Sequence, residues 1–236
     1  MEQCLMIIAA LLPAIVLGIY IWRRDPQPEP FKWVMRAFIA GIVICMPVAW
    51  AENVISAILF AGGEPTTLFG TTVQAFFVAA FPEETAKLLA LWLVLRKCPY
   101  FDEHFDGVVY AAFVGLGFAA IENIFYVIGS GEGWASVALI RALLAVPGHY
   151  AFAIIMGYYY SKYRFFDHST GAAIKVLLVP VLAHGAYDAI AMSSSVDPIA
   201  GSLSFIVLVW FCIKLQKQAR RRIAELAATN HTTESI

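Results

Sequence analysis

Long apolar stretches separated by short polar segments run along almost the whole chain. They are bounded by charged residues or by segments rich in glycine and proline. They lie at about residues 4–22, 32–60, 70–97, 107–128, 134–163, 170–192 and 199–213. A helix needs about 20 apolar residues to cross the ~30 Å hydrocarbon core of a bilayer. The pattern therefore predicts an all-α protein, a polytopic bundle of about seven transmembrane helices.

The composition agrees with a membrane environment. Of the 236 residues, 61% are hydrophobic and only 14% are charged, whereas a soluble domain carries about 25% charged residues. No basic patch interleaves with aromatic residues, so no nucleic-acid partner is expected. The four cysteines are far apart, which indicates neither a disulfide framework nor a cysteine metal site. The lipid bilayer is the expected surrounding of the chain.

The basic residues of the loops predict the orientation of the bundle. They cluster after every second predicted helix, at Arg23, Arg24, Lys32, Arg96, Lys97, Lys162, Arg164 and Arg220–Arg222. The loops around Gly62, Gly129 and Ser193 contain none. Because Lys and Arg in short loops favour the cytoplasmic side, the N-terminus should lie outside and the C-terminus in the cytoplasm. Residues 1–222 would form one transmembrane domain, and residues 223–236 a short disordered cytoplasmic tail.

Ionisable residues nevertheless occur within the apolar stretches. Glu83, Glu84 and Lys87 lie between residues 72 and 95, and each costs about 2.5–3.5 kcal/mol at membrane depth even on a lenient insertion scale. They therefore need partners inside the bundle. The candidates on other predicted helices are Glu122, Asn123, His149, His184 and Asp188.

Counting residues from the cytoplasmic ends of the helices places these groups at similar depths. At ~1.5 Å per residue, Glu83 lies about 21 Å, Glu122 and Asp188 about 24 Å, and His149 and His184 about 18 Å from those ends. Unrelated structural polar residues would be scattered in depth. The common layer therefore predicts one polar site in the middle or outer half of the bilayer.

Residue spacing within single helices predicts two side-chain pairs. Glu83 and Lys87 are four residues apart, as are His184 and Asp188, so each pair shares a helix face. Pro82 removes a helical hydrogen bond just before the glutamates. Irregular backbone at membrane depth is typical of a cavity lining.

These residue types suit hydrolysis by water. Two histidines and several carboxylates offer nitrogen and oxygen ligands for a zinc-type site. A glutamate outside the ligand set would be a general base acting on a water molecule. No serine or cysteine at this depth stands next to a base, which disfavours a covalent mechanism.

Two other classes of function remain open from the residues alone. Glu, His and Asp side chains on several helices also form the proton relays of proton- or cation-coupled transporters. A relay would be staggered through the membrane, however, and the sequence contains no inverted repeat. A non-catalytic membrane scaffold would keep the polar cluster for assembly. Glu52 and Arg141, nearer the outer surface, are interpreted as structural.

Four motifs in order resemble the PrsW family of intramembrane proteases across roughly residues 75–190. They are Glu83-Glu84-x-x-Lys87, Phe118-x-x-x-Glu122-Asn123, an isolated His149, and His184-x-x-x-Asp188. That family belongs to a wider group with the type II CAAX prenyl proteases and bacteriocin-immunity proteins. The wider group usually shows Glu-Glu-x-x-x-Arg and Phe-x-x-x-His, and both departures here point towards PrsW.

The resemblance implies a protease of the bacterial inner membrane. It would cut a single-span membrane protein, similar to an anti-sigma factor, near its extracytoplasmic side and so start a stress response. Glu83, Glu84, His149 and His184 would be catalytic, with Glu83 as the base because Lys87 lies at the favoured offset. Zinc, if a metal is used, would be bound by Glu122, His149 and His184, with Lys87, Asn123 and Asp188 in support. The metal and the oligomeric state stay open.

Overall fold

The fold is a bundle of helices. The computed structural model describes residues 2–61, 63–196 and 198–233, and regular structure in these ranges is helical throughout. The α-helices are α1 (Glu2–Trp22), α2 (Phe31–Phe60), α3 (Leu68–Val73), α4 (Phe81–Leu95), α5 (Asp106–Gly129), α6 (Trp134–Ile140), α7 (Val146–Phe165), α8 (Thr170–Ser193) and α9 (Pro198–Thr233). The predicted all-α bundle is confirmed.

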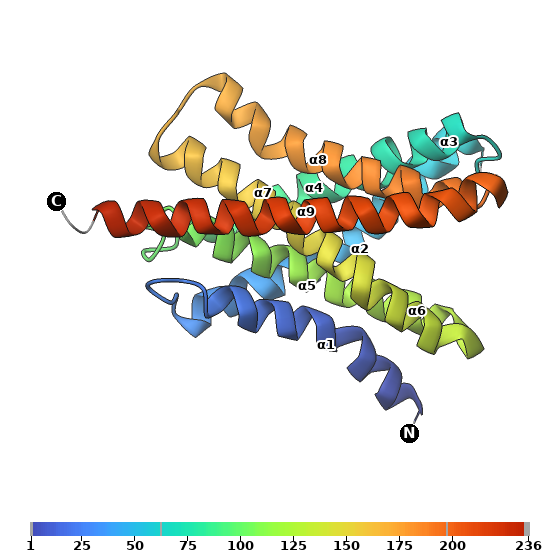
Figure 1. Ribbon diagram of the computed structural model, residues 1–236, viewed down its shortest axis with the longest axis horizontal. Coiled ribbons are helices and arrows are strands. Elements are labelled where there is room, and N and C mark those ends of the chain that lie inside the picture. Colours follow the sequence, from blue (N-terminus) through green and yellow to red (C-terminus); the bar gives the residue numbers. More distant parts are fainter. Residues whose placement is uncertain (1, 62, 197, 234–236) are drawn as a thin grey trace.

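Several of these helices join into longer units. A π-helical segment, Gln74–Ala80, connects α3 to α4, and a second one, Arg141–Ala145, connects α6 to α7. The described helices therefore form seven long units, in agreement with the sequence (Figure 1). Five long helical segments among the described residues are apolar enough to cross a membrane by length and composition. The unit formed by α3 and α4 is outside this set, and it carries Glu83, Glu84 and Lys87.

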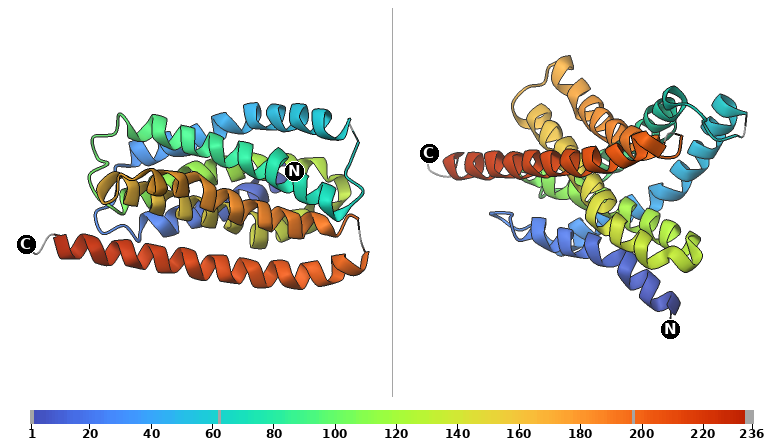
Figure 2. Two further views of the ribbon diagram at one scale, coloured as in Figure 1. Left: turned by 90° about the horizontal axis from the view of Figure 1, so that it is seen from above. Right: turned by 45° about the vertical axis from the view of Figure 1, so that its right-hand side comes forward.

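The loops separate into two groups at opposite ends of the bundle. The α1–α2, α4–α5 and α7–α8 connections lie at the end where α9 finishes (Figures 1 and 2). The α2–α3, α5–α6 and α8–α9 connections lie towards the other end, as does the N-terminal end of α1 (Figures 1 and 2). All the connections rich in Lys and Arg thus share one end, as the alternation of basic loops predicts.

We expect the end without basic loops to face the outside. In a variant without the four native cysteines, single cysteines at positions 63, 131 and 194 should react in intact cells with a membrane-impermeant thiol reagent. Cysteines at positions 97 and 164 should react only after the cells are opened. The reverse pattern would invert the topology and place the polar site nearer the cytoplasm.

Helix α5 is the central helix of the bundle. Its residues are buried without interruption from Asp106 to Ala120. A Cβ atom added at Gly41 of α2 would lie 2.0 Å from the carbonyl oxygen of Val114, and one added at Gly115 would lie 2.6 Å from the Cβ of Ala153 on α7. Close approach of this kind needs small residues. It brings the α5 and α7 segments that carry polar residues against each other.

Each π-helical segment ends just before a proline. Pro82 and Pro147 are the second residues of α4 and α7. A proline has no N–H and its ring crowds the carbonyl of the preceding turn, so a regular α-helix cannot pass through it unchanged. The N–H groups of Phe81 and Val146 bond five residues back, which widens the turn. Such π-helical turns occur frequently at functional sites, and these two lead directly into Glu83 and His149.

The C-terminal residues differ from the sequence prediction. A disordered tail was expected from residue 223, but α9 continues as one helix to Thr233. Alanine, leucine and glutamate, which are good helix formers, dominate residues 224–228. The Arg222 side chain also donates a hydrogen bond to the Tyr158 hydroxyl at 2.8 Å and thereby ties α9 to α7. The division of the chain into domains stays a prediction.

Candidate active site

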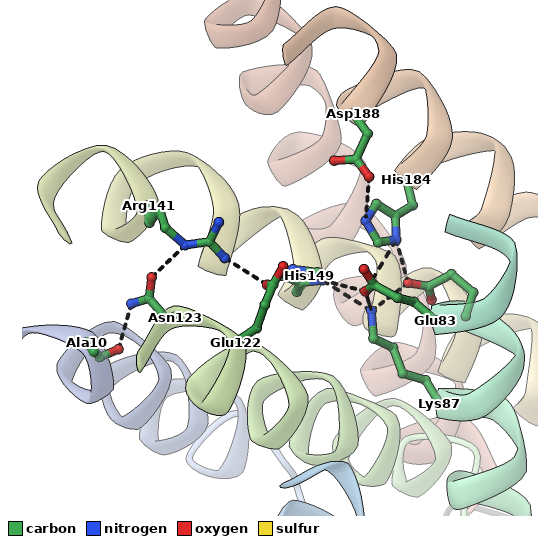
Figure 3. A network of polar contacts seen from close by, with 10 residues as sticks. Ala10, Glu83, Lys87, Glu122, Asn123, Arg141, His149, His184 and Asp188 are labelled. Atoms are coloured by element: carbon green, nitrogen blue, oxygen red, sulfur yellow. Dashed lines mark hydrogen bonds and ion pairs between the residues drawn. The ribbon is translucent and has the colours of Figure 1, made fainter. Parts of the chain in front are cut away.

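Lys87 lies at the centre of the polar layer. Its Nζ atom donates hydrogen bonds to Glu83 Oε2 at 2.9 Å and to Glu84 Oε1 at 2.8 Å, and it lies 3.1 Å from His149 Nδ1 (Figure 3). A lysine ammonium group has three donors, and these three acceptors use all of them. The same ammonium group lies 4.4 Å from the ring centroid of Phe118. Lys87 therefore holds α4, α5 and α7 together at this depth.

His149 lies between Lys87 and Glu122. Its Nε2 atom is 2.8 Å from Glu122 Oε2. Because the ammonium group of Lys87 can only donate, Nδ1 must accept and Nε2 must carry the proton that Glu122 accepts. The contacts thus favour a ring orientation in which Nδ1 faces Lys87 and Nε2 faces Glu122.

His184 has carboxylates at both ring nitrogens. Nδ1 lies 2.9 Å from Glu84 Oε1, and Nε2 lies 3.2 Å from Asp188 Oδ2. Two carboxylate acceptors favour a ring that carries a proton on each nitrogen. The predicted pairing of His184 with Asp188 is present, and Phe152 stacks on the ring at a centroid distance of 4.7 Å. Orientation of His184 therefore depends on both α4 and α8.

A second branch of the network reaches α1. Arg141 donates from Nη2 to Glu122 Oε2 at 2.7 Å and from Nε to Asn123 Oδ1 at 2.8 Å. Asn123 in turn donates to the backbone carbonyl of Ala10 at 2.8 Å (Figure 3). Asn123 was expected from the sequence to support the site. Its side chain contacts Arg141 and α1, and not a histidine.

The network borders a cavity of about 710 Å³. Glu83, Glu122, His149, His184 and Asp188 are among its lining residues. Glu84, with none of its surface exposed, and Lys87 do not line it. The two adjacent glutamates therefore differ: only Glu83 can meet a molecule in the cavity without rearrangement.

The structure brings together the site residues predicted from sequence, with one difference in arrangement. One donor atom each from Glu83, Glu84, His149 and His184 lies within 4.8 Å of the others, and this donor group does not include Glu122. Glu122 is engaged instead by Arg141 and by the far nitrogen of His149. Of the three ligands expected from the sequence, His149 and His184 belong to the donor group, whereas Glu122 lies beside it.

Two residues interpreted as structural also border the cavity, namely Glu52 and Arg141. Glu52 and Glu83 both line it, so their side chains border the same cavity. Arg141 offers a cation to Glu122, as described above. A lone arginine in an apolar helix needs an intramembrane carboxylate partner, and this signal was present in the sequence.

The donor group suits a zinc-type ion in its chemistry. Two imidazole nitrogens and two carboxylate oxygens are ligands that zinc commonly takes in four-coordinate sites. Glu84 Oε2 is buried and has no hydrogen-bond partner among the described residues, as a ligand atom would be. In this structure the ammonium group of Lys87 provides the positive charge among Glu83, Glu84 and His149.

The chain is similar to known proteins over most of its length. A family model described as PrsW family intramembrane metalloprotease matches residues 29–214. A relative named Protease PrsW from Bacillus subtilis is 36% identical over 218 residues, covering 90% of this chain and 94% of the relative. Those from Oceanobacillus iheyensis and Geobacillus kaustophilus are 34% and 30% identical, cover 86% and 91% of this chain, and are themselves covered to 89% and 92%. No solved structure matches the chain.

The matched segment contains the whole donor group and the residues that contact it, from Glu52 to Asp188. Its long apolar helices and polar intramembrane cavity are those expected of an enzyme that works within a bilayer. The chain is thus a multi-pass membrane protein that belongs to the PrsW family of intramembrane metalloproteases, which are hydrolases acting on protein substrates in the membrane.

Proposed function

We propose that the protein hydrolyses a peptide bond of a single-span membrane protein in the cavity, with Glu83 as the general base. The observation that carries this assignment is the difference between the adjacent glutamates. Glu83 lines the cavity, whereas Glu84 is enclosed behind it. A general base must come within hydrogen-bonding reach of the proton that it removes. Glu83 satisfies this requirement for a water molecule in the cavity.

The neighbours of Glu83 position it and balance its charge. Lys87 fixes Glu83 Oε2 and leaves the rest of the carboxylate free for water. Glu84 and Asp188 hold His184 from both sides, which sets the direction of its ring. Side chains fixed in this way lose little entropy when the substrate binds, which favours the transition state.

The donor group described above would hold a zinc ion through His149, His184 and Glu84 and leave Glu83 as the base. Binding would require His184 to lose the proton on Nδ1 and the ammonium group of Lys87 to move aside. A bound zinc ion would supply a Lewis acid for the carbonyl of the scissile peptide bond. Glu122 and Asp188 would orient the two imidazoles from their other nitrogens, a role that outer carboxylates commonly have at metal sites.

The lining of the cavity supports cleavage near the extracytoplasmic side. Besides the polar network, the cavity is bordered by Ser56, Glu64 and Ser194. These residues lie near or in the α2–α3 and α8–α9 connections, at the end without basic loops. The substrate segment would enter from that end, consistent with a target similar to an anti-sigma factor and with a role at the start of a stress response.

We expect the purified protein to bind about one zinc ion per chain. His149→Ala and His184→Ala should each lose most of the zinc and of the cleavage of a single-span test substrate, because each removes a nitrogen ligand. Zinc content is measured by plasma mass spectrometry, and cleavage is measured by the mass of the released fragment. His168→Ala changes an exposed histidine outside the donor group and is the matched control.

Equal zinc content in wild type and both histidine variants would contradict the metal assignment. Absence of any cleaved fragment from the zinc-loaded wild type would contradict the hydrolytic assignment. The two readouts therefore test the two parts of the proposal separately.

A further inference from the structure

A second cluster of carboxylates lies away from the cavity. Asp25 and Glu29 belong to the α1–α2 connection, and Asp106 is the first residue of α5. Their exposed fractions are 5%, 4% and 1%. One oxygen from each side chain lies within 4.8 Å of the others. Asp106 and Glu122 are separated by 16 positions of α5, or about 24 Å at 1.5 Å per residue, so this cluster is distinct from the active site.

The three side chains have few partners for their negative charge. The Tyr110 hydroxyl donates to Glu29 Oε2, and the backbone N–H groups of Asp102 and Glu103 donate to Asp106 Oδ2 at 3.0 and 2.6 Å. Asp25 Oδ1 accepts from the N–H group of Gln27 at 3.1 Å. None of the three carboxylates forms an ion pair with a basic side chain in the described part of the chain.

The second carboxylate oxygen of Asp25 is left without a partner for its negative charge in the described part of the chain. Asp25 Oδ2 is buried and has no hydrogen-bond partner among the described residues. A buried carboxylate oxygen without a partner is costly, and such an orphan atom in a native fold needs an explanation. The orphan atom belongs to a member of the cluster, so a cation bound by the three acids would give the Asp25 carboxylate a partner.

The electrostatics of the loop support the same conclusion. Burial raises the pKa of Asp25 to about 7, and the neighbouring charge of Glu29 adds to this rise. Burial also raises the pKa of Glu29. Nearby acids therefore make each other harder to ionise, and a positive charge between them would remove this penalty.

We propose that Asp25, Glu29 and Asp106 bind a divalent cation that prefers oxygen ligands. All three donors are carboxylates, which suit calcium or magnesium better than the softer ions that bind imidazole or thiolate. Calcium–oxygen distances of 2.3–2.6 Å allow ligands across one ion to lie up to about 5 Å apart, so the separation within 4.8 Å accommodates calcium with little rearrangement. The ion would clamp the α1–α2 connection onto the start of α5, the central helix.

The test is a calcium and magnesium titration of the full-length purified protein after extensive dialysis against buffer that contains neither of these ions nor a chelator. Isothermal titration should show one calcium site per chain, and the melting temperature should rise with calcium concentration because the ion binds only the folded cluster. Asp25→Asn and Glu29→Gln should each weaken binding at least tenfold while leaving the zinc content unchanged. Asp102→Asn removes an exposed carboxylate beside the cluster and should bind as wild type does.

Three results would overturn the proposal. The first is wild-type protein that binds neither calcium nor magnesium up to millimolar concentration. The second is undiminished binding by Asp25→Asn and Glu29→Gln, which would place the ion elsewhere. The third is a melting temperature that rises in Asp25→Asn and responds to neither cation in wild type, which would show that the fold is more stable with an uncharged residue at position 25 and without an ion. If Asp25→Asn does not fold, Glu29→Gln and the wild-type titration still decide the matter.

Discussion

Replacing Glu83 by glutamine is expected to slow peptide-bond cleavage by at least about 10²–10⁴-fold, the contribution of a general base. Glutamine keeps the shape of the side chain and its oxygen can still accept from Lys87, but the amide cannot take a proton from water. Lys87 would also keep Glu84 and His149 as partners. The variant should therefore fold, insert and melt close to the wild-type temperature.

Single-turnover cleavage of a membrane-embedded substrate measures this effect without the contribution of product release. Glu64→Gln is the matched control because Glu64 is exposed and lines the same cavity outside the polar network. It should retain wild-type cleavage. Near-normal cleavage by Glu83→Gln, with strong loss in Glu84→Gln, would transfer the role of base to Glu84.

Replacing His184 by alanine is expected to give a folded protein that captures its substrate but does not cut it. The imidazole contacts Glu84 and Asp188 at the site. Glu84 keeps its hydrogen bond from Lys87, and Asp188 lines the cavity, where water can replace the ring. The helices are held mainly by close contacts at Gly41 and Gly115, which this change leaves intact.

Cleavage by this variant should fall by at least about 10²-fold, as expected on losing an essential acid, base or donor. Co-purification with a tagged single-span substrate measures capture, and fragment release measures cleavage. A His184→Ala protein that unfolds would indicate that the histidine mainly stabilises the bundle. One that cuts at the wild-type rate would remove His184 from the catalytic group.

The parts of the fold set by local patterns could be predicted from the sequence. Apolar stretches of membrane-spanning length predicted the helices. A segment in lipid must hydrogen-bond its own backbone N–H and C=O groups, and a helix does so within the segment. Residue counting brought Glu83, His149 and His184 to one depth because the rise per residue is nearly constant. The pairs Glu83–Lys87 and His184–Asp188 followed from four-residue spacing, and both contacts are present.

The rotation of the helices could not be predicted in the same way. The role of Glu122 depends on which nitrogen of His149 faces it, and this depends on the packing of α5 against α7. The π-helical segment Arg141–Ala145 also shifts the helical phase just before His149, so counting at 3.6 residues per turn does not place Arg141. The contact between Arg141 and Glu122 therefore appears only in the folded bundle.

The spacing of Asp25, Glu29 and Asp106 along the sequence does not predict that their carboxylates form a cluster. Two of its members lie in an irregular connection, and the third begins a helix about 80 residues later in the chain. They are close only because the α1–α2 connection and the start of α5 lie at the same end of the bundle (Figure 2). Contacts of this kind depend on tertiary packing and not on local pattern.

Proteolysis by the intramembrane site is tested most directly in liposomes that contain the purified protein and a single-span substrate. The released fragment and the internal pH are followed in the same preparation, with Glu83→Gln as the inactive reference. Hydrolysis at the polar layer predicts a fragment cut within or beside the membrane span, formed by wild type and not by Glu83→Gln, with no proton movement that depends on the protein. Wild-type protein that moves protons and cuts none of the single-span proteins offered would contradict the protease mechanism and favour a proton relay.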